Sequence, residues 1–264
     1  GRSSQPWLFC VGFFKPHLPF AAPKRWYDVH EGTIAQLPEA VAARPIWHSG
    51  WHRSGEFTGN YRHPDGIDAN SNVEYAQKIR HAYVAAISYM DAQVGRLLTA
   101  LHDQGLDRNT VVVAWSDHGF LLGEHSIWGK HCLYEHALRS PLIIRCPGLE
   151  HPGKISSAVV ETVDIFPTLV DLCGLEPPIG LDGQSLLPHL ADPATATSKP
   201  ARSFWNGDRY TVRNSRWRLT SILDQVSDDR GVHYELFDYE SDPLETVNLA
   251  EQYPDVVAEL SKAL

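Results

Sequence analysis

The sequence lacks an excess of basic residues and lacks any apolar run long enough to cross a bilayer. Its 32 acidic residues outnumber its 23 Lys and Arg residues and leave a formal net charge of -9. A nucleic-acid-binding protein is expected to carry a basic face, so the bulk charge argues against that role. The opening residues GRSSQPWLFC also lack the basic and then apolar build of a signal peptide. We therefore expect any export signal to lie outside this chain.

Closely spaced cysteine pairs are missing as well. The four cysteines are widely spread, at Cys10, Cys132, Cys146 and Cys173. Without a CxxC pair they predict neither a structural zinc site nor a disulfide framework, and we expect buried thiols. No Asn-x-Ser/Thr site occurs in the sequence, which disfavours a eukaryotic secretory or lysosomal product.

The sequence does contain the alternation of helices and strands that is typical of α/β proteins. Apolar spacing predicts a long amphipathic helix that begins at a capping box of Ser71 and Glu74. Two short apolar runs follow, Val111 to Trp115 and residues 141–148, and they predict buried strands of the parallel type. The expected fold class is therefore α/β, with a mostly parallel sheet flanked by helices.

The two ends of the chain differ from its middle. The apolar run from Trp7 to Phe14 predicts another buried strand, and a chain that starts inside a core strand is expected to be the latter part of a longer protein. A polar, Pro-containing connector lies at 191–201. We therefore expect residues 1–195 to form part of an α/β domain that is incomplete at its N-terminus. Residues 196–264 are expected to form a small antiparallel α+β subdomain with a terminal helix.

Residues 44–70 carry neither a strand period nor a helix period, and they predict a long irregular surface segment. Such segments are often functional. His48 and His52 are four positions apart, which leaves a metal pair and a simple rim loop as alternatives. Gly50 weakens a helix there and no acidic partner accompanies the two histidines, so the rim loop is favoured.

Asp117 and His118 follow the predicted strand that ends at Trp115. Ligands of an open parallel sheet bind outside the carboxyl ends of its strands, and Gly119 lets the chain turn sharply there. A carboxylate at that position suits a hard divalent cation, with the imidazole completing part of the shell. The alternative is that Asp117 caps the next turn and His118 packs.

Two further groups of polar residues point to an anion site. Lys130 lies close enough along the chain to reach an anion at the same loop, with Glu124 and His125 as candidate supporting groups. Lys15 and His17 follow the first apolar run, and a stiff His beside a Lys suits anion binding and proton transfer. Solvated surface charges and an ordinary polar turn are the alternatives.

Three segments carry a resemblance to a known family. They are VGFFKPHLPFAAPKRWYD, the stretch from AISYMDAQVG through AWSDHGFLLGEHSIWGKH to PLIIRCPG, and ELFDYESDPLETVNLAEQ. Together they resemble the sulfatase family of the alkaline phosphatase superfamily, with the Lys-Pro-His-x-Pro-Phe and Asp-His-Gly steps most similar to its iduronate-2-sulfatase branch. The resemblance spans nearly the whole chain and keeps the family's order of motifs.

The resemblance implies roles for individual residues. Asp117 and His118 are expected to bind the active-site calcium, with magnesium as the alternative ion, and nitrogen is an unusual donor for so hard a cation. Lys130 and His17 are expected to contact the sulfate oxygens, and one of them to protonate the leaving alcohol. Lys15 and His125 complete the expected substrate-binding set.

The sequence also departs from the family pattern. Sulfatases use a formylglycine made from the Cys of a Cys-x-Pro/Ala-x-Arg motif, together with an Asp-Asp pair near the N-terminus. This sequence contains no such Cys motif and no Asp-Asp pair in its N-terminal part. Without a nucleophile this chain alone is expected to be inactive. We therefore expect an N-terminal portion of the same protein as its partner, and a periplasmic or secreted bacterial location.

The expected function is sulfuric ester hydrolysis on a sulfated sugar, such as a 2-O-sulfated uronic acid or a related polysaccharide unit. The Trp- and His-rich residues 47–63 are a candidate sugar pocket. A phosphodiesterase or phosphonate monoester hydrolase is one alternative. A sulfated-glycan-binding module without catalysis is another.

Overall fold

The computed structural model describes residues 5–43, 55–61, 64, 66–197, 199–223 and 231–264. His48 and His52, and with them most of the predicted rim loop, lie outside the described residues. No helix within these ranges is both long enough and apolar enough to span a membrane.

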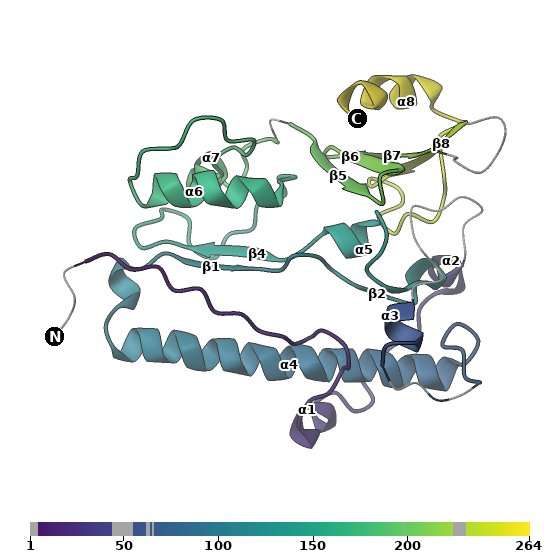
Figure 1. The fold of residues 1–264 in the computed structure, drawn as a ribbon, viewed down its shortest axis with the longest axis horizontal. Coiled ribbons are helices and arrows are strands. Elements are labelled where there is room, and N and C mark those ends of the chain that lie inside the picture. The colour runs from purple at the N-terminus through teal and green to yellow at the C-terminus, as the bar shows by residue number, and fades with distance from the viewer. Residues whose placement is uncertain (1–4, 44–54, 62–63, 65, 198, 224–230) are drawn as a thin grey trace.

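The longest element is α4 (Val73–Asp103), the 31-residue helix that runs along one side of the molecule in Figure 1. It confirms the predicted amphipathic helix, but the predicted cap is wrong by one residue. The side chain of Asn72 caps the helix by accepting a hydrogen bond from the backbone N–H of Tyr75 at 2.8 Å. The short α1 (Lys24–Asp28) packs on α4, where His81 Nε2 lies 2.7 Å from the carbonyl oxygen of Tyr27.

The strands β1 (Val112–Trp115) and β4 (Leu142–Arg145) correct the predicted parallel sheet. They pair with each other in the antiparallel direction, with Val112 opposite Arg145 and Trp115 opposite Leu142. Every strand pair among the described residues is antiparallel. Parallel pairing requires a long crossover connection, usually a helix. The connection from β1 to β4 contains no long helix and folds back through a hairpin instead.

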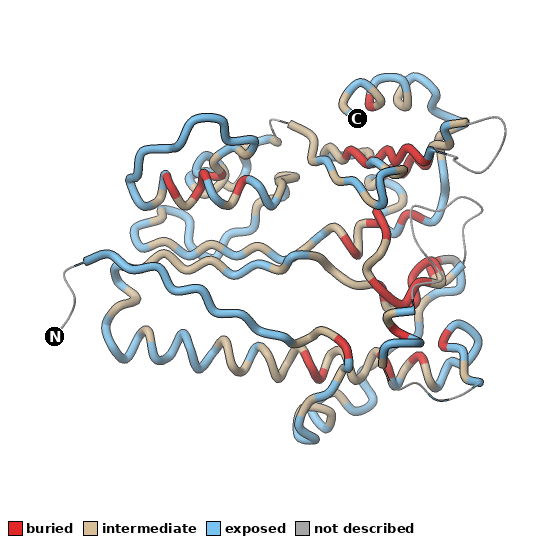
Figure 2. Tube along the Cα trace, viewed as in Figure 1, coloured by how far each residue is buried: buried red, intermediate tan, exposed pale blue. Residues whose placement is uncertain are grey.

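The predicted burial of these apolar runs is also wrong within the described chain. The side chain of Trp115 on β1 is 55% exposed and that of Ile143 on β4 is 66% exposed. Residues 6–14 form no strand, and Leu8 and Phe9 are among the exposed residues that Figure 2 colours pale blue. An apolar run shows that a segment suits burial, but burial needs a covering partner, and the described residues cover β1 and β4 only in part.

Between β1 and β4 the chain forms a compact region that carries most of the candidate site residues. Its core is a cluster of six buried residues, Leu121, Ile127, Cys132, Tyr134, Ala137 and Phe237. The elements between the two strands are short: β2 (Leu121–Leu122), η2 (Glu124–Ser126), β3 (Trp128–Gly129) and α5 (Glu135–Leu138). Two short helices from earlier in the chain contact this region, α2 (Glu39–Ala42) at η2 and α3 (Gly55–Thr58) at β3. Strands β2 and β3 pair as an antiparallel hairpin.

The C-terminal part confirms the predicted antiparallel strands and terminal helix. Four strands form a meander in chain order: β5 (Ala201–Trp205), β6 (Arg209–Arg213), β7 (Trp217–Leu223) and β8 (Val232–Asp238). The helix α8 (Pro254–Leu260) packs Leu260 against Val212, Leu219 and Leu236 of this sheet. The domain boundary near residue 195 stays a prediction.

The remaining elements are short helices: η1 (Asp107–Asn109), η3 (Thr162–Asp164), α6 (Ile165–Leu172), α7 (Leu187–Ala191) and η4 (Ser261–Ala263). The four cysteines are free, as predicted, but the expectation of buried thiols holds only for Cys132. Cys10 and Cys173 are exposed and Cys146 is half-buried.

Candidate active site

The structure brings His17 and Lys130 together across 113 positions of sequence, with Lys130 Nζ 3.3 Å from His17 Nε2. His17 lies in the turn after the first apolar run, and Lys130 directly follows β3. Both side chains are half-buried. A lysine ammonium and an imidazole held this close can contact one anion jointly, which is the arrangement that the predicted sulfate contacts require.

A carboxylate that the sequence did not single out joins this pair. Glu56 Oε1 lies 2.8 Å from Lys130 Nζ and 3.3 Å from His17 Nε2, and Glu56 Oε2 lies 3.9 Å from His131 Nδ1. Burial alone would raise the pKa of Glu56, but the hydrogen bond and the charge of Lys130 outweigh it and hold that pKa below its ordinary value. Glu56 is therefore an ionised partner of the cluster at neutral pH.

His131 connects the cluster to the predicted metal ligands. Burial lowers the pKa of His131 more strongly than Glu56 raises it, and the neighbouring charges of Lys130 and His118 lower it further. His131 is therefore a neutral imidazole at neutral pH. The electrostatic effect of His118 also shows that the loop after β1 lies near the Lys130 cluster.

Asp117 and His118 lie side by side in the loop after β1, as predicted. His118 Nε2 is 3.5 Å from Asp117 Oδ2, and the carboxylate of Asp117 is largely exposed. His118 Nδ1 donates a hydrogen bond to the carbonyl oxygen of Gly119 at 2.6 Å, which leaves Nε2 on the side of Asp117. A metal-binding histidine is usually oriented by such a backbone acceptor on its other nitrogen. These two residues therefore fit part of a divalent-cation shell.

They do not form a whole shell by themselves. Calcium takes six to eight oxygen ligands, so one carboxylate and one imidazole supply only part of its coordination. Among the described residues no three His, Cys, Asp or Glu side chains converge as a metal site. The metal role of Asp117 and His118 accordingly stays a prediction.

Gly119 holds this loop against α5. Its backbone N–H donates to the carbonyl oxygen of Ala137 at 2.7 Å, and a Cβ at this position would lie only 2.0 Å from the carbonyl oxygen of His136. Only glycine allows so close an approach of two backbones. The glycine of the Asp-His-Gly step therefore fixes the position of the two residues before it.

The other two predicted substrate contacts lie in different surroundings. Lys15 Nζ donates to the carbonyl oxygens of Pro19 and His17, the latter at 3.3 Å, so it stabilises the turn that presents His17. His125 is buried, and its ring stacks on Tyr134 with centroids 4.0 Å apart. The structure thus places His125 in the core and Lys15 against its own turn. Substrate contacts by either residue stay predictions.

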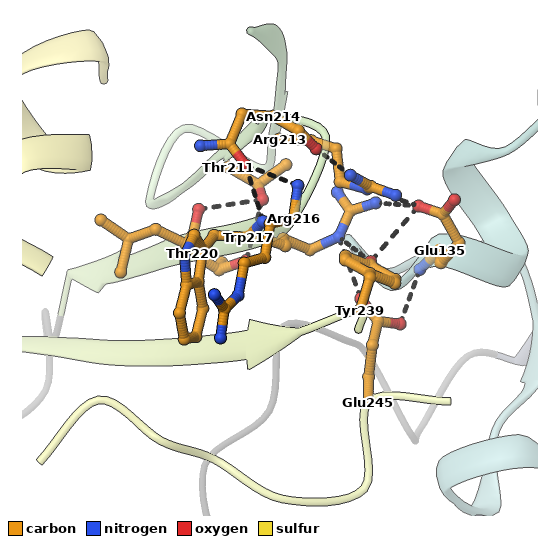
Figure 3. A network of polar contacts seen from close by, with 11 residues as sticks. Glu135, Thr211, Arg213, Asn214, Arg216, Trp217, Thr220, Tyr239 and Glu245 are labelled. Atoms are coloured by element: carbon orange, nitrogen blue, oxygen red, sulfur yellow. Dashed lines mark hydrogen bonds and ion pairs between the residues drawn. The ribbon is translucent and has the colours of Figure 1, made fainter. Parts of the chain in front are cut away.

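A buried ionic network ties α5 to the C-terminal sheet. Figure 3 shows Glu135, Tyr239 and Glu245 converging beside the sheet, where Tyr239 donates to Glu245 Oε1 at 2.6 Å. The guanidinium of Arg218, which is almost fully buried, bonds to Glu135 and lies 2.9 Å from Glu245 Oε1. Glu245 also accepts the backbone N–H of Glu135 at 2.8 Å. Because α5 also contacts Gly119, this network helps to hold the Asp117–His118 loop in place through α5.

Comparison with known proteins fits this geometry. A family model described as Sulfatase matches residues 1–175, and one described as N-sulphoglucosamine sulphohydrolase, C-terminal, matches residues 123–264. Human iduronate 2-sulfatase is 30% identical, with 94% of this chain and 58% of the human protein aligned. The chain spans about half the length of the curated relatives it matches.

Solved structures agree on the fold. A structure described as a 2-O GAG sulfatase superposes with a TM-score of 0.72 at 26% identity, covering 88% of this chain and 51% of the other. The phosphonate monoester hydrolase of Silicibacter pomeroyi superposes with a TM-score of 0.75 at 26% identity, covering 94% and 53%. The resemblance read from the motifs is thus confirmed, and the chain belongs to the sulfatase family of the alkaline phosphatase superfamily.

Proposed function

We propose that this chain supplies the leaving-group side of the active site of a sulfuric ester hydrolase that acts on a sulfated sugar. The observation that carries the proposal is the pairing of Lys130 Nζ with His17 Nε2 at 3.3 Å, beside the Asp117–His118 loop. A lysine ammonium and an imidazole next to a candidate metal-binding loop suit the charge that develops on a transferring sulfuryl group.

The two donors have distinct tasks. Lys130, which is always a donor when charged, holds the sulfate oxygens by charge-assisted hydrogen bonds. His17 accepts or donates a proton at Nε2, because its Nδ1 lies 2.8 Å from the carbonyl oxygen of Leu18 and is fixed as a donor there. We therefore assign His17 to protonation of the leaving alcohol and Lys130 to the sulfate, which separates two roles that the motifs alone left shared.

Asp117 and His118 are proposed to bind calcium, with magnesium as the alternative ion. When bound, the metal would polarise the sulfate, and a formylglycine on an N-terminal portion of the same protein would supply the nucleophile. The proposed partners are that N-terminal portion and a sulfated carbohydrate, in a periplasmic or secreted location. The similarity to human iduronate 2-sulfatase and to a 2-O GAG sulfatase supports a 2-O-sulfated uronic acid or a related polysaccharide unit as substrate.

A phosphonate monoester hydrolase is the second candidate, because the Silicibacter pomeroyi enzyme superposes over 94% of this chain. The experiment that separates the two uses the full-length protein with added calcium. Release of inorganic sulfate from 2-O-sulfated uronic acid oligosaccharides is compared with hydrolysis of aryl phosphonate monoesters.

We expect sulfate release to have the higher kcat/KM. A higher kcat/KM on the phosphonate would favour the second candidate. Binding of the sulfated oligosaccharide without turnover would instead indicate a glycan-binding module. Asp117→Ala is expected to weaken calcium binding in titration calorimetry, and unchanged affinity would remove Asp117 from the metal site.

A further inference from the structure

The short helix α3 (Gly55–Thr58) is held directly against the strand that leads to Lys130. The ring of Phe57 stacks on that of Trp128 with centroids 5.7 Å apart and an interplanar angle of 20°. Both side chains belong to one buried core cluster. Because Phe57 anchors the helix, the neighbouring Glu56 is presented to the site from a fixed position and not from a free surface loop.

The carboxylate of Glu56 contacts both proposed sulfate donors through the same oxygen. Oε1 lies 2.8 Å from Lys130 Nζ and 3.3 Å from His17 Nε2, while Oε2 faces His131 Nδ1 at 3.9 Å. The Glu56 side chain is 16% exposed, so solvent screens these interactions less than it screens a surface ion pair. The three groups form a closed triangle, because Lys130 Nζ and His17 Nε2 are themselves 3.3 Å apart.

Such a triangle needs its acidic member. Lys130 and a protonated His17 at this separation repel each other, and the lysine side chain has many rotamers that would take its charge into water. A carboxylate bonded to both offsets the repulsion and restricts the rotamers. The same contact keeps both groups aimed at one point, as a sulfate contact and an acid for the leaving alcohol require.

We propose that Glu56 is a positioning residue of the sulfatase reaction, which orients His17 and Lys130 toward the sulfate ester. This inference rests on the proposed function, since the reaction supplies the need for two groups aimed at one sulfate. Glu56 acts through its two partners and makes no contact with the reacting atoms. The competing arrangement, in which the carboxylate occupies the place of the bound sulfate, makes the opposite prediction for substrate binding.

The test compares Glu56→Gln and Glu56→Asp in the full-length protein, with Glu150→Gln, an exposed loop glutamate, as the matched control. For Glu56→Gln we expect kcat on the sulfated oligosaccharide to fall roughly 10- to 100-fold, as for a misplaced catalytic group. KM is expected to change by less than about twofold.

Glu56→Asp keeps the charge and is expected to retain more activity than Glu56→Gln, whereas Glu150→Gln should match the wild type. An unchanged kcat in Glu56→Gln would overturn the proposal, as would equal losses in both Glu56 variants. A lower KM with unchanged kcat would show that Glu56 competes with sulfate for its donors.

A second measurement separates this inference from the proposed function. The imidazole nitrogen resonances of His17 are expected to shift between wild type and Glu56→Gln, and those of exposed His151 are expected to stay in place. If the wild type releases no sulfate, the proposed function fails while this spectrum still tests the contact. Identical His17 resonances in both proteins would overturn the positioning role whatever the activity.

Discussion

Arg218 is the residue whose loss should cost this protein most, because its charge is almost fully buried and compensates two carboxylates. Its side chain is 2% exposed, it bonds to Glu135, and its Nε lies 2.9 Å from Glu245 Oε1. Nε also donates to the hydroxyl oxygen of Tyr239 at 2.7 Å. Arg218→Met fills similar space but leaves Glu245 without its cation, whereas Glu135 keeps Arg213 Nε at 3.5 Å.

Breaking a buried ion pair by removing one partner costs about 3–5 kcal/mol, because the remaining charge is uncompensated. We expect a loss of this size for Arg218→Met, since Glu245 is fully buried beside it. The assay is urea unfolding of the purified protein, followed by near-ultraviolet circular dichroism. Arg216→Met, in the bend that precedes β7, is the control, because the Arg216 side chain is 44% exposed, and it should lose much less stability.

A second substitution sharpens this test. Adding Glu245→Gln to Arg218→Met removes the carboxylate that has lost its cation, so the double variant should be more stable than Arg218→Met alone. If Arg218→Met costs no more than Arg216→Met, or if the double variant is the less stable one, the network does not stabilise the protein in the way described.

Three further predictions follow from single contacts. Gly119→Ala should destabilise the protein by about 1–3 kcal/mol, because the added Cβ would overlap a backbone carbonyl of α5. The control Gly95→Ala on α4, whose Cβ would meet no atom, should stabilise it by roughly 0.5–1 kcal/mol. Equal shifts of the two variants in thermal unfolding would contradict this prediction. Burial raises the pKa of the Cys132 thiol to about 12. In labelling at pH 8, followed by mass spectrometry, iodoacetamide should therefore modify exposed Cys173 and reach Cys132 only after unfolding. Equal labelling of both thiols in the native protein would refute the burial of Cys132. The pKa of Glu56 lies below its ordinary value, so its ionised form stabilises the fold above the unfolded carboxyl pKa of about 4.3. This stability is lost as the pH falls through the lower pKa of the folded state. Urea unfolding between pH 7 and pH 3 should therefore show a steeper loss of stability for the wild type than for Glu56→Gln, and parallel curves would contradict the pairing.

Much of the fold could be predicted from local patterns. The period of apolar residues predicted α4, and the alternation after residue 200 predicted the C-terminal sheet and α8. These elements bury one face against a neighbour that the chain itself provides, so their sequence period reports their structure.

The direction and burial of the central strands could not be predicted in the same way. A run such as Val112–Trp115 is equally apolar in a parallel and in an antiparallel sheet, and the pairing with β4 depends on how the intervening chain returns. The exposed run that includes Leu8 shows that apolar character predicts suitability for burial and not the presence of a partner.

The candidate site also contains residues that the sequence could predict and one that it could not. Motif order led to His17 and Lys130, and the structure places them in contact. No sequence pattern pointed to Glu56, because it lies in a segment without a helix or strand period. Its partner Lys130 is 74 positions later in the chain, and its other partner, His17, lies in an earlier segment. A contact of this kind is set by tertiary packing, here by Phe57 on Trp128, and becomes visible only in three dimensions.

The most direct test of the account is the rate at which the full-length protein and its Lys130→Ala variant release inorganic sulfate from a 2-O-sulfated uronic acid oligosaccharide. Lys154→Ala, in an exposed loop, serves as the control. We predict measurable release by the wild type and by Lys154→Ala, and a loss of about 100- to 1,000-fold in kcat for Lys130→Ala. Wild-type rates in Lys130→Ala would contradict the assignment of this cluster to the sulfate, and no release by the wild type on any sulfated sugar would contradict the proposed function itself.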